Sequence, residues 1–171
     1  MSQDALHRGN ATDAVDAIVE QWHRERPDLD PSAKHVTGRL VRLFGTFQAA
    51  QREAYKEFGI NETDFGILAP LRRAGAPFAL TPTELARAQM MTSGGMTAAI
   101  DRLERKGLVE RVPNPADRRG ALVRLTDDGR RVIDTAMEIH CRIEHDMVAA
   151  LTPKQRDQLA DLLRALVLSH D

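Results

Sequence analysis

The sequence has few aromatic residues and a single cysteine. Phe, Trp and Tyr together make up 4% of its 171 residues, whereas 29% are charged. A chain rich in leucine, alanine, arginine and acidic residues favours helices over sheets, so the composition predicts a mainly α fold. Cys141 has no second cysteine to pair with, which excludes an internal disulfide framework and indicates a reducing compartment.

Long apolar runs and enzyme motifs are also missing. No apolar stretch approaches the roughly 20 residues that a membrane-spanning helix needs, and the polar first ten residues do not resemble a signal peptide. We find no glycine-rich phosphate loop, nucleophile elbow, His-Glu-x-x-His motif or paired-cysteine motif. These absences predict a cytoplasmic protein that is not an enzyme, uses no cofactor and has no membrane partner.

Helix signals divide the chain into four segments. Residues 1–10 are expected to be disordered. Residues 11–60 should form two helices, the first ending before Pro27 and the second opening with Asp30 as N-cap and Pro31 as its first residue. Residues 61–130 should form a domain that opens with a helix capped by Asn61, with Asp64 three residues further on. Residues 131–171 should form C-terminal helices, of which the last starts with the capping box of Thr152 and Gln155. Because a small domain cannot bury all the apolar stripes of the terminal helices, these helices are expected to dimerise.

Capping residues place two short helices and a hairpin inside the third segment. Thr81-Pro82-Thr83-Glu84 has the residues of a capping box with proline at the first helical position. A turn through Met90 and Met91 leads to a second helix, which Thr92 caps and which runs to Lys106. Strands are expected over 108–112 and 121–125, and the loop between them should continue neither strand. This order of elements predicts that residues 61–130 are a winged helix-turn-helix DNA-binding domain with a small β-hairpin wing.

The second helix of the pair opens with small residues that suit close approach to DNA. Candidate contacts are Thr92, Ser93, Gly94, Gly95 and Thr97. Two successive glycines cost a helix about 1 kcal/mol each, so close approach of another surface explains them better than helix stability does. Packing of another helix against them is the alternative. Further along, Arg102 is expected on the solvent side, where it would contact phosphates or a guanine edge.

The hairpin tip carries two cations. Asp117 can pair with a neighbouring arginine and hold it extended, which leaves Arg118 and Arg119 to reach a narrow, strongly negative minor groove. An ordinary charged hairpin tip is the alternative. Although the net charge is −1, residues 100–131 have nine basic and six acidic residues, whereas residues 132–171 have four basic and seven acidic ones. This segregation of charge fits a DNA-binding segment followed by an acidic arm.

Three stretches resemble a known family. They read T-P-T-E-L-A, then T-S-G-G-M-T-A-A-I-D-R-L-E-R-K-G-L-V-E-R, then N-P-A-D-R-R-G-A-L-V-R-L-T-D-D-G-R, and they are similar to the winged helix-turn-helix of MarR-type transcriptional regulators. The resemblance implies a homodimer on double-stranded DNA, a recognition helix starting at Thr92 or Ser93, and Arg119 in the minor groove with Asp117 supporting it. A two-fold dimer would read a pseudo-palindromic operator with half-sites roughly 34–36 Å apart.

Release by a small-molecule effector is also implied by the resemblance. The N-terminal helix with Trp22 is similar to the urate-responsive subgroup, but the aspartate and arginine of that subgroup fall at Gly66 and Ala99 here. A different anionic or phenolic effector is therefore expected near four residues, with plain core packing as their alternative role. These residues are Trp22, Arg26, Phe44 and Phe47.

Three further hypotheses about function remain open. His140, Cys141, Glu144 and His145 lie on one helix with i,i+4 spacings that can place ligand pairs on one face, which would suit a metal-sensing regulator. Adjacent helical residues diverge by about 100°, so a partly buried, solvated helix face is the alternative. Cys141 could act as a peroxide-sensing thiol. Finally, the winged helix could bind only protein.

Overall fold

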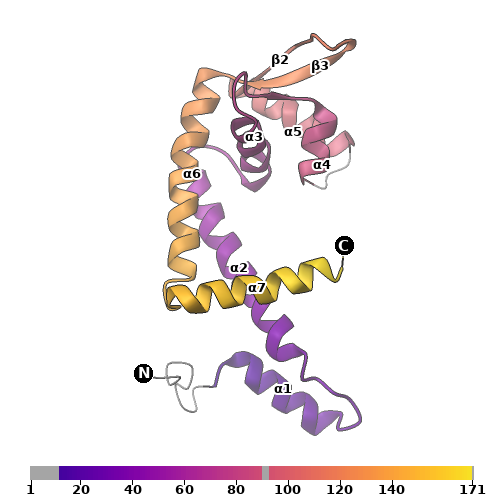
Figure 1. The fold of residues 1–171 in the computed structure, drawn as a ribbon, viewed down its shortest axis with the longest axis vertical. Coiled ribbons are helices and arrows are strands. Elements are labelled where there is room, and N and C mark those ends of the chain that lie inside the picture. Colours follow the sequence, from indigo (N-terminus) through magenta and orange to yellow (C-terminus); the bar gives the residue numbers. More distant parts are fainter. Residues whose placement is uncertain (1–11, 90–92, 171) are drawn as a thin grey trace. The chain divides into compact units, whose positions relative to one another are not determined.

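The structure is a computed structural model that describes residues 12–89 and 93–170. The segment 1–10, predicted to be disordered, lies outside the described residues, as do Met90, Met91 and Thr92. The chain forms two compact units, Met1–Gln48 and Ala49–Asp171, which divide within a long helix. Among the described residues, seven α-helices and a three-stranded antiparallel sheet confirm the predicted mainly helical fold with a hairpin wing (Figure 1).

The first unit contains α1 (Ala14–Glu25) and most of α2 (Lys34–Lys56). Asp13 caps α1, and its Oδ1 accepts from the amide of Val15 at 2.7 Å. The prediction that α2 starts at Pro31 is wrong, because the Pro31 carbonyl instead accepts from the amide of Lys34 in a turn that precedes the helix. Asp30 Oδ1 accepts from the amide of Ser32 at 2.9 Å, so the aspartate stabilises this turn rather than the helix N-terminus.

The second unit builds the winged helix. After the end of α2 come α3 (Glu62–Arg73), β1 (Ala79–Leu80), α4 (Pro82–Gln89), α5 (Ser93–Arg105), β2 (Val109–Asn114), β3 (Asp117–Leu125), α6 (Asp127–Met147) and α7 (Pro153–Leu168). The predicted caps are present at three of these helices: Asn61 with Asp64 on α3, Thr81 with Glu84 on α4, and Thr152 with Gln155 on α7. None of the described helices is long and apolar enough to cross a bilayer.

The sheet differs from the prediction in two ways. Its strand order is β1-β3-β2, and the two-residue β1, which pairs with Val123 and Arg124, was not predicted. Both hairpin strands also run closer to the tip than predicted, since β2 includes Pro113 and β3 includes Gly120. Proline is tolerated because β2 is an edge strand, and the pairing register shifts between Pro113 and Asn114.

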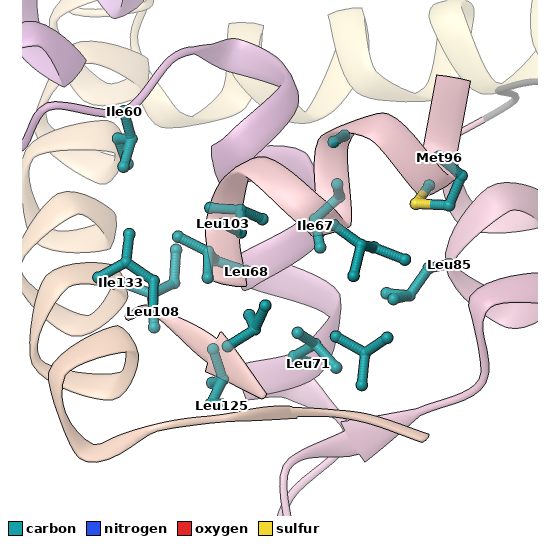
Figure 2. Close-up of a cluster of buried hydrophobic side chains, with 14 of the residues drawn as sticks. Ile60, Ile67, Leu68, Leu71, Leu85, Met96, Leu103, Leu108, Leu125 and Ile133 are labelled. Atoms are coloured by element: carbon teal, nitrogen blue, oxygen red, sulfur yellow. The ribbon is translucent and has the colours of Figure 1, made fainter. Parts of the chain in front are cut away.

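One apolar core holds the helix-turn-helix and the wing together. Figure 2 shows side chains from α3, α4, α5, both hairpin strands and α6 meeting in this core. Leu68, Leu85 and Leu103 are fully buried there. Burial of each such side chain contributes about 2 kcal/mol, so the core fixes α4, α5 and the hairpin as one body.

Candidate nucleic-acid interface

Helix α5 has one buried face and one exposed face. Met96, Ile100 and Leu103 are at most 1% exposed and anchor the helix in the core. The opposite side exposes Gly94 and Ala98. Residues 94, 98, 101 and 105 follow the spacing i, i+4, i+7, i+11, so they form one stripe along the helix. Along this stripe, the first two turns of α5 therefore expose only small residues to solvent.

Gly94 does not serve internal packing. A Cβ built at this exposed position would meet no heavy atom within 4 Å. The alternative of helix packing through the glycine pair therefore finds no support at Gly94, whereas Gly95 is half-buried. Thr97 is exposed, the backbone of Ser93 begins α5, and Thr92 lies outside the described residues.

Arg102 is not the solvent-facing arginine that the sequence predicted. Its Nε and Nη2 both donate to Oδ1 of Asp64, at 3.0 and 2.6 Å. Lys106 Nζ donates to the other carboxylate oxygen of Asp64 at 2.8 Å and to the carbonyl of Gly59 at 2.7 Å. Asp64 is fully buried, and each cation keeps 34% of its side chain exposed. These bonds fasten the second half of α5 to the start of α3.

From the sequence, Asp64 was predicted only to take part in the helix cap at Asn61. The structure confirms the cap, because Asp64 Oδ2 accepts from the amide of Asn61 at 3.3 Å, and it adds the cations of Arg102 on α5 and of Lys106 directly after α5. The available signal was the i,i+4 pair Arg102 and Lys106 on a face next to the core, which requires a buried counter-charge. Nothing local in the sequence indicates that the counter-charge comes from Asp64.

Arg111 links α5 to the wing and was also missed. From β2, its Nη2 donates to Oδ1 of Asp101 at 2.5 Å, and its Nη1 donates to Oε2 of Glu104. Its backbone amide also donates to Glu104 Oε1 at 3.3 Å. The hydrogen bond to Asp101, with help from Glu104, raises the pKa of Arg111 above its ordinary value, so the guanidinium stays charged.

The wing is a short-tipped hairpin that projects beyond α4 and α5 (Figure 1). Its tip is the turn Pro115–Ala116, in which Asn114 Oδ1 accepts from the amide of Ala116 at 2.9 Å. Asp117 opens β3, and a Cβ at Gly120 would lie 3.2 Å from Oδ2 of Asp117, so the glycine leaves room for this carboxylate. The backbones of Arg118 and Arg119 follow directly in β3. Support of an arginine by Asp117 stays a prediction.

Of the four residues predicted to bind an effector, Trp22 lines a hollow that the other three do not line. The hollow is also lined by Leu29, Asp30, Pro31 and Lys34. Arg26 instead pairs with Asp28, with Nη2 and Oδ2 2.6 Å apart. The alternative prediction, that these residues pack in the core of the single chain, is wrong for Trp22 and Phe44, which are 42% and 59% exposed. Phe47 is half-buried.

His140 belongs to an aromatic cluster within the second unit. Its Nδ1 lies 2.7 Å from the hydroxyl of Tyr55, its ring stacks on Phe65, and its Nε2 lies 3.1 Å from Oε1 of Glu144. Burial raises the pKa of Tyr55, which keeps the phenol protonated as a donor. Cys141 and His145 are exposed. Within residues 12–89 and 93–170, no three His, Cys, Asp or Glu side chains are placed to hold a metal ion.

Comparison with known proteins identifies the family. The profile of the MarR family matches residues 58–120. The HTH-type transcriptional regulator PecS of Dickeya dadantii is 36% identical over 149 residues, which is 87% of this chain and 90% of that protein. The chain belongs to the MarR family. The multiple antibiotic resistance protein MarR of Salmonella typhimurium agrees, with 38% identity over 73% of this chain and 84% of the relative.

Solved MarR structures have the same fold. A cysteine-to-serine mutant of MarR from E. coli complexed with operator DNA matches with a TM-score of 0.68 and 28% identity, over 81% of this chain and 99% of that chain. The apo form of wild-type E. coli MarR matches with a TM-score of 0.64 and 30% identity, over 76% and 95%. As a member of the MarR family, the chain is a transcriptional regulator and not an enzyme, as the sequence predicted.

Proposed function

We propose that the chain is a homodimeric repressor, acting in the cytoplasm, that binds a pseudo-palindromic operator and is released by a small-molecule effector. The observation that carries the DNA-binding part is the open first half of α5, next to a projecting wing. A helix with small outward residues fits the major groove closely, and its N-terminal amides favour phosphate. The related E. coli MarR has been solved in complex with operator DNA, which supports DNA binding by this chain.

The proposed contacts come from two elements. Residues 93–95 and Thr97 at the start of α5 enter the major groove, together with Thr92, which precedes the helix in sequence. The wing reaches the minor groove with Arg118 and Arg119. Asp117 supports one of these arginines. We leave Arg102 out of the interface, because Asp64 already accepts from two of its nitrogens.

Arg119→Ala tests the wing. After a bound duplex has been selected from a random DNA pool, fluorescence anisotropy should show that this variant binds it at least about tenfold more weakly. If Arg119 contacts phosphates as well as the groove floor, the plot of log affinity against log salt should also become shallower by about one unit. Arg164→Ala, an exposed arginine on α7, is the matched control and should leave affinity unchanged. Equal affinities of Arg119→Ala and wild type would refute the wing assignment.

The dimer is proposed because both units expose apolar helix faces. In the first unit, Val36, Leu43 and Phe44 are each more than half exposed. On α7, Leu162 and Val167 are 66% and 59% exposed, and they lie on one face with Leu159 and Leu166. Contiguous apolar surface of this kind is rarely left open in a monomer, and a second copy of the chain would cover it.

Leu162→Glu tests the dimer. A carboxylate buried at a dimer interface loses its hydration and the apolar contact of the leucine, so the dimer dissociation constant should rise about 100-fold. Sedimentation velocity over a concentration series measures the change. Arg164→Glu, which introduces the same side chain away from the apolar face of α7, should remain dimeric. A wild-type protein that sediments as a monomer would contradict the proposal directly.

The effector part rests on the hollow beside Trp22. This hollow combines an indole ring, apolar Leu29 and Pro31, the cation of Lys34 and the carboxylate of Asp30, which already accepts from the amide of Ser32. The indole ring and the Lys34 cation suit an aromatic anion. Because Trp22 is the only tryptophan in the sequence, its fluorescence reports on occupancy of this hollow alone. Screening aromatic carboxylates and phenols for both a fluorescence change and release of bound duplex tests this part separately from DNA binding.

A further inference from the structure

The exposed stripe of α5 carries a carboxylate at its centre. Asp101 lies on the same face as Gly94, Ala98 and Arg105, and Glu104 lies one turn from it on the flank of that face. Their side chains are 42% and 40% exposed. In the proposed complex this face points toward DNA, where an unpaired carboxylate would be repelled by phosphates.

The cations of α5 and of Lys106, the residue after it, do not remove this charge. Arg102 and Lys106 are both bonded to buried Asp64. Arg105 forms no ion pair with the other described residues of the chain. With Asp101 and Glu104 unpaired, the outer side of the second half of α5 would therefore be net negative.

Arg111 supplies the missing charge from β2. Its guanidinium donates to Asp101 and to Glu104 through different nitrogens, so one cation engages both carboxylates. Its side chain is 35% exposed, and the hydrogen bonds to Asp101 and Glu104 use its two terminal nitrogens. A planar guanidinium can bridge two carboxylates in this way, whereas a lysine ammonium acts as a single point charge.

Building on the proposed DNA-binding function, we propose that Arg111 is a positioning residue that makes the recognition face of α5 compatible with DNA by neutralising Asp101 and Glu104. Arg111 acts through these two carboxylates and not through a phosphate contact of its own. The arrangement also holds both carboxylates toward β2, away from the small residues of the stripe.

Removal and rescue test this role. Arg111→Met keeps the length and apolar stem of the side chain but leaves both carboxylates unpaired, and its affinity for the selected duplex should fall roughly tenfold. Adding Asp101→Asn and Glu104→Gln to Arg111→Met removes the repulsion, so this triple variant should bind within about threefold of wild type. Arg111→Lys should lie between wild type and Arg111→Met. Because the ion pairs are partly exposed, melting temperatures should move by only about 4 °C or less.

Each outcome bears on the proposal. Rescue by the two amides supports neutralisation, since neither a direct phosphate contact nor a mechanical link to the wing would be restored by them. Failure of the triple variant to recover affinity while it melts normally would overturn the proposal, and so would unchanged affinity in Arg111→Met. A wild-type protein that binds no selected duplex would instead overturn the proposed function, and with it the role of Arg111.

Discussion

Gly129→Ala is expected to lower the free energy of unfolding by about 3 kcal/mol. A Cβ at Gly129 would lie 1.9 Å from the carbonyl oxygen of Leu108 and 2.9 Å from its carbonyl carbon. Both atoms are backbone, so no side-chain rotation relieves the clash. The Leu108 oxygen is also held in place, because it accepts from the amide of Thr126 at 3.2 Å. Overpacking of a filled site costs about 1–3 kcal/mol and sometimes more.

The glycine is required by how α6 begins. Thr126 caps α6, its Oγ1 accepting from the amide of Gly129 at 2.9 Å and donating to the carbonyl of Gly107 at 2.7 Å. The first turn of α6 is thereby pressed against the chain segment that joins α5 to β2. Since α5 and the wing meet at this segment, Gly129→Ala should weaken DNA binding as well as stability.

Gly94→Ala is the matched control, since Gly94 also lies in the first turn of a helix. Its Cβ would meet nothing within 4 Å, so the substitution should leave stability unchanged or raise it by up to about 1 kcal/mol. Urea unfolding at one fixed protein concentration compares the two variants. Similar destabilisation by both substitutions would contradict the close contact of Gly129 with Leu108.

Local features of the fold were predictable, and long-range ones were not. The capping boxes at Asn61, Thr81 and Thr152 involve residues three positions apart, so the sequence displays both partners together. The two-residue β1 has no alternation of its own and forms only because β3 offers it a partner. The start of α2 was predicted too early because Asp30-Pro31 satisfies the rules for a turn as well as those for a helix start.

In the candidate site, too, local features were predictable from the sequence and long-range contacts were not. The small residues at the start of α5 and the cations of the wing could be found in sequence, because each set is contiguous. The two ion-pair groups that position α5 join residues of different elements: Asp64 with Arg102, 38 positions apart, and Asp101 with Arg111, 10 positions apart. In sequence, the i,i+4 pair Arg102 and Lys106 indicates that a counter-charge is needed, but not that Asp64 supplies it.

Asp64→Ala is expected to cost about 2–3 kcal/mol of stability. The fully buried carboxylate of Asp64 accepts from Arg102, from Lys106 and from the amide of Asn61, and alanine satisfies none of these donors. Breaking a buried ion pair costs about 3–5 kcal/mol when the remaining charge stays buried. Here Arg102 and Lys106 are each about a third exposed and can turn toward water, so the loss should be smaller.

Asp134→Ala provides the control for burial. Asp134 also pairs with an arginine, its Oδ1 lying 2.7 Å from Arg72 Nε, but it is 47% exposed. Exposed pairs contribute about 0–1 kcal/mol, so its removal should be barely detectable in the same urea titration. Equal losses of stability in Asp134→Ala and Asp64→Ala would show that burial of Asp64 adds nothing to the contribution of its ion pairs.

Because Arg102 and Lys106 fasten the second half of α5, Asp64→Ala should also weaken DNA binding under conditions where the protein remains folded. Asp134→Ala should not.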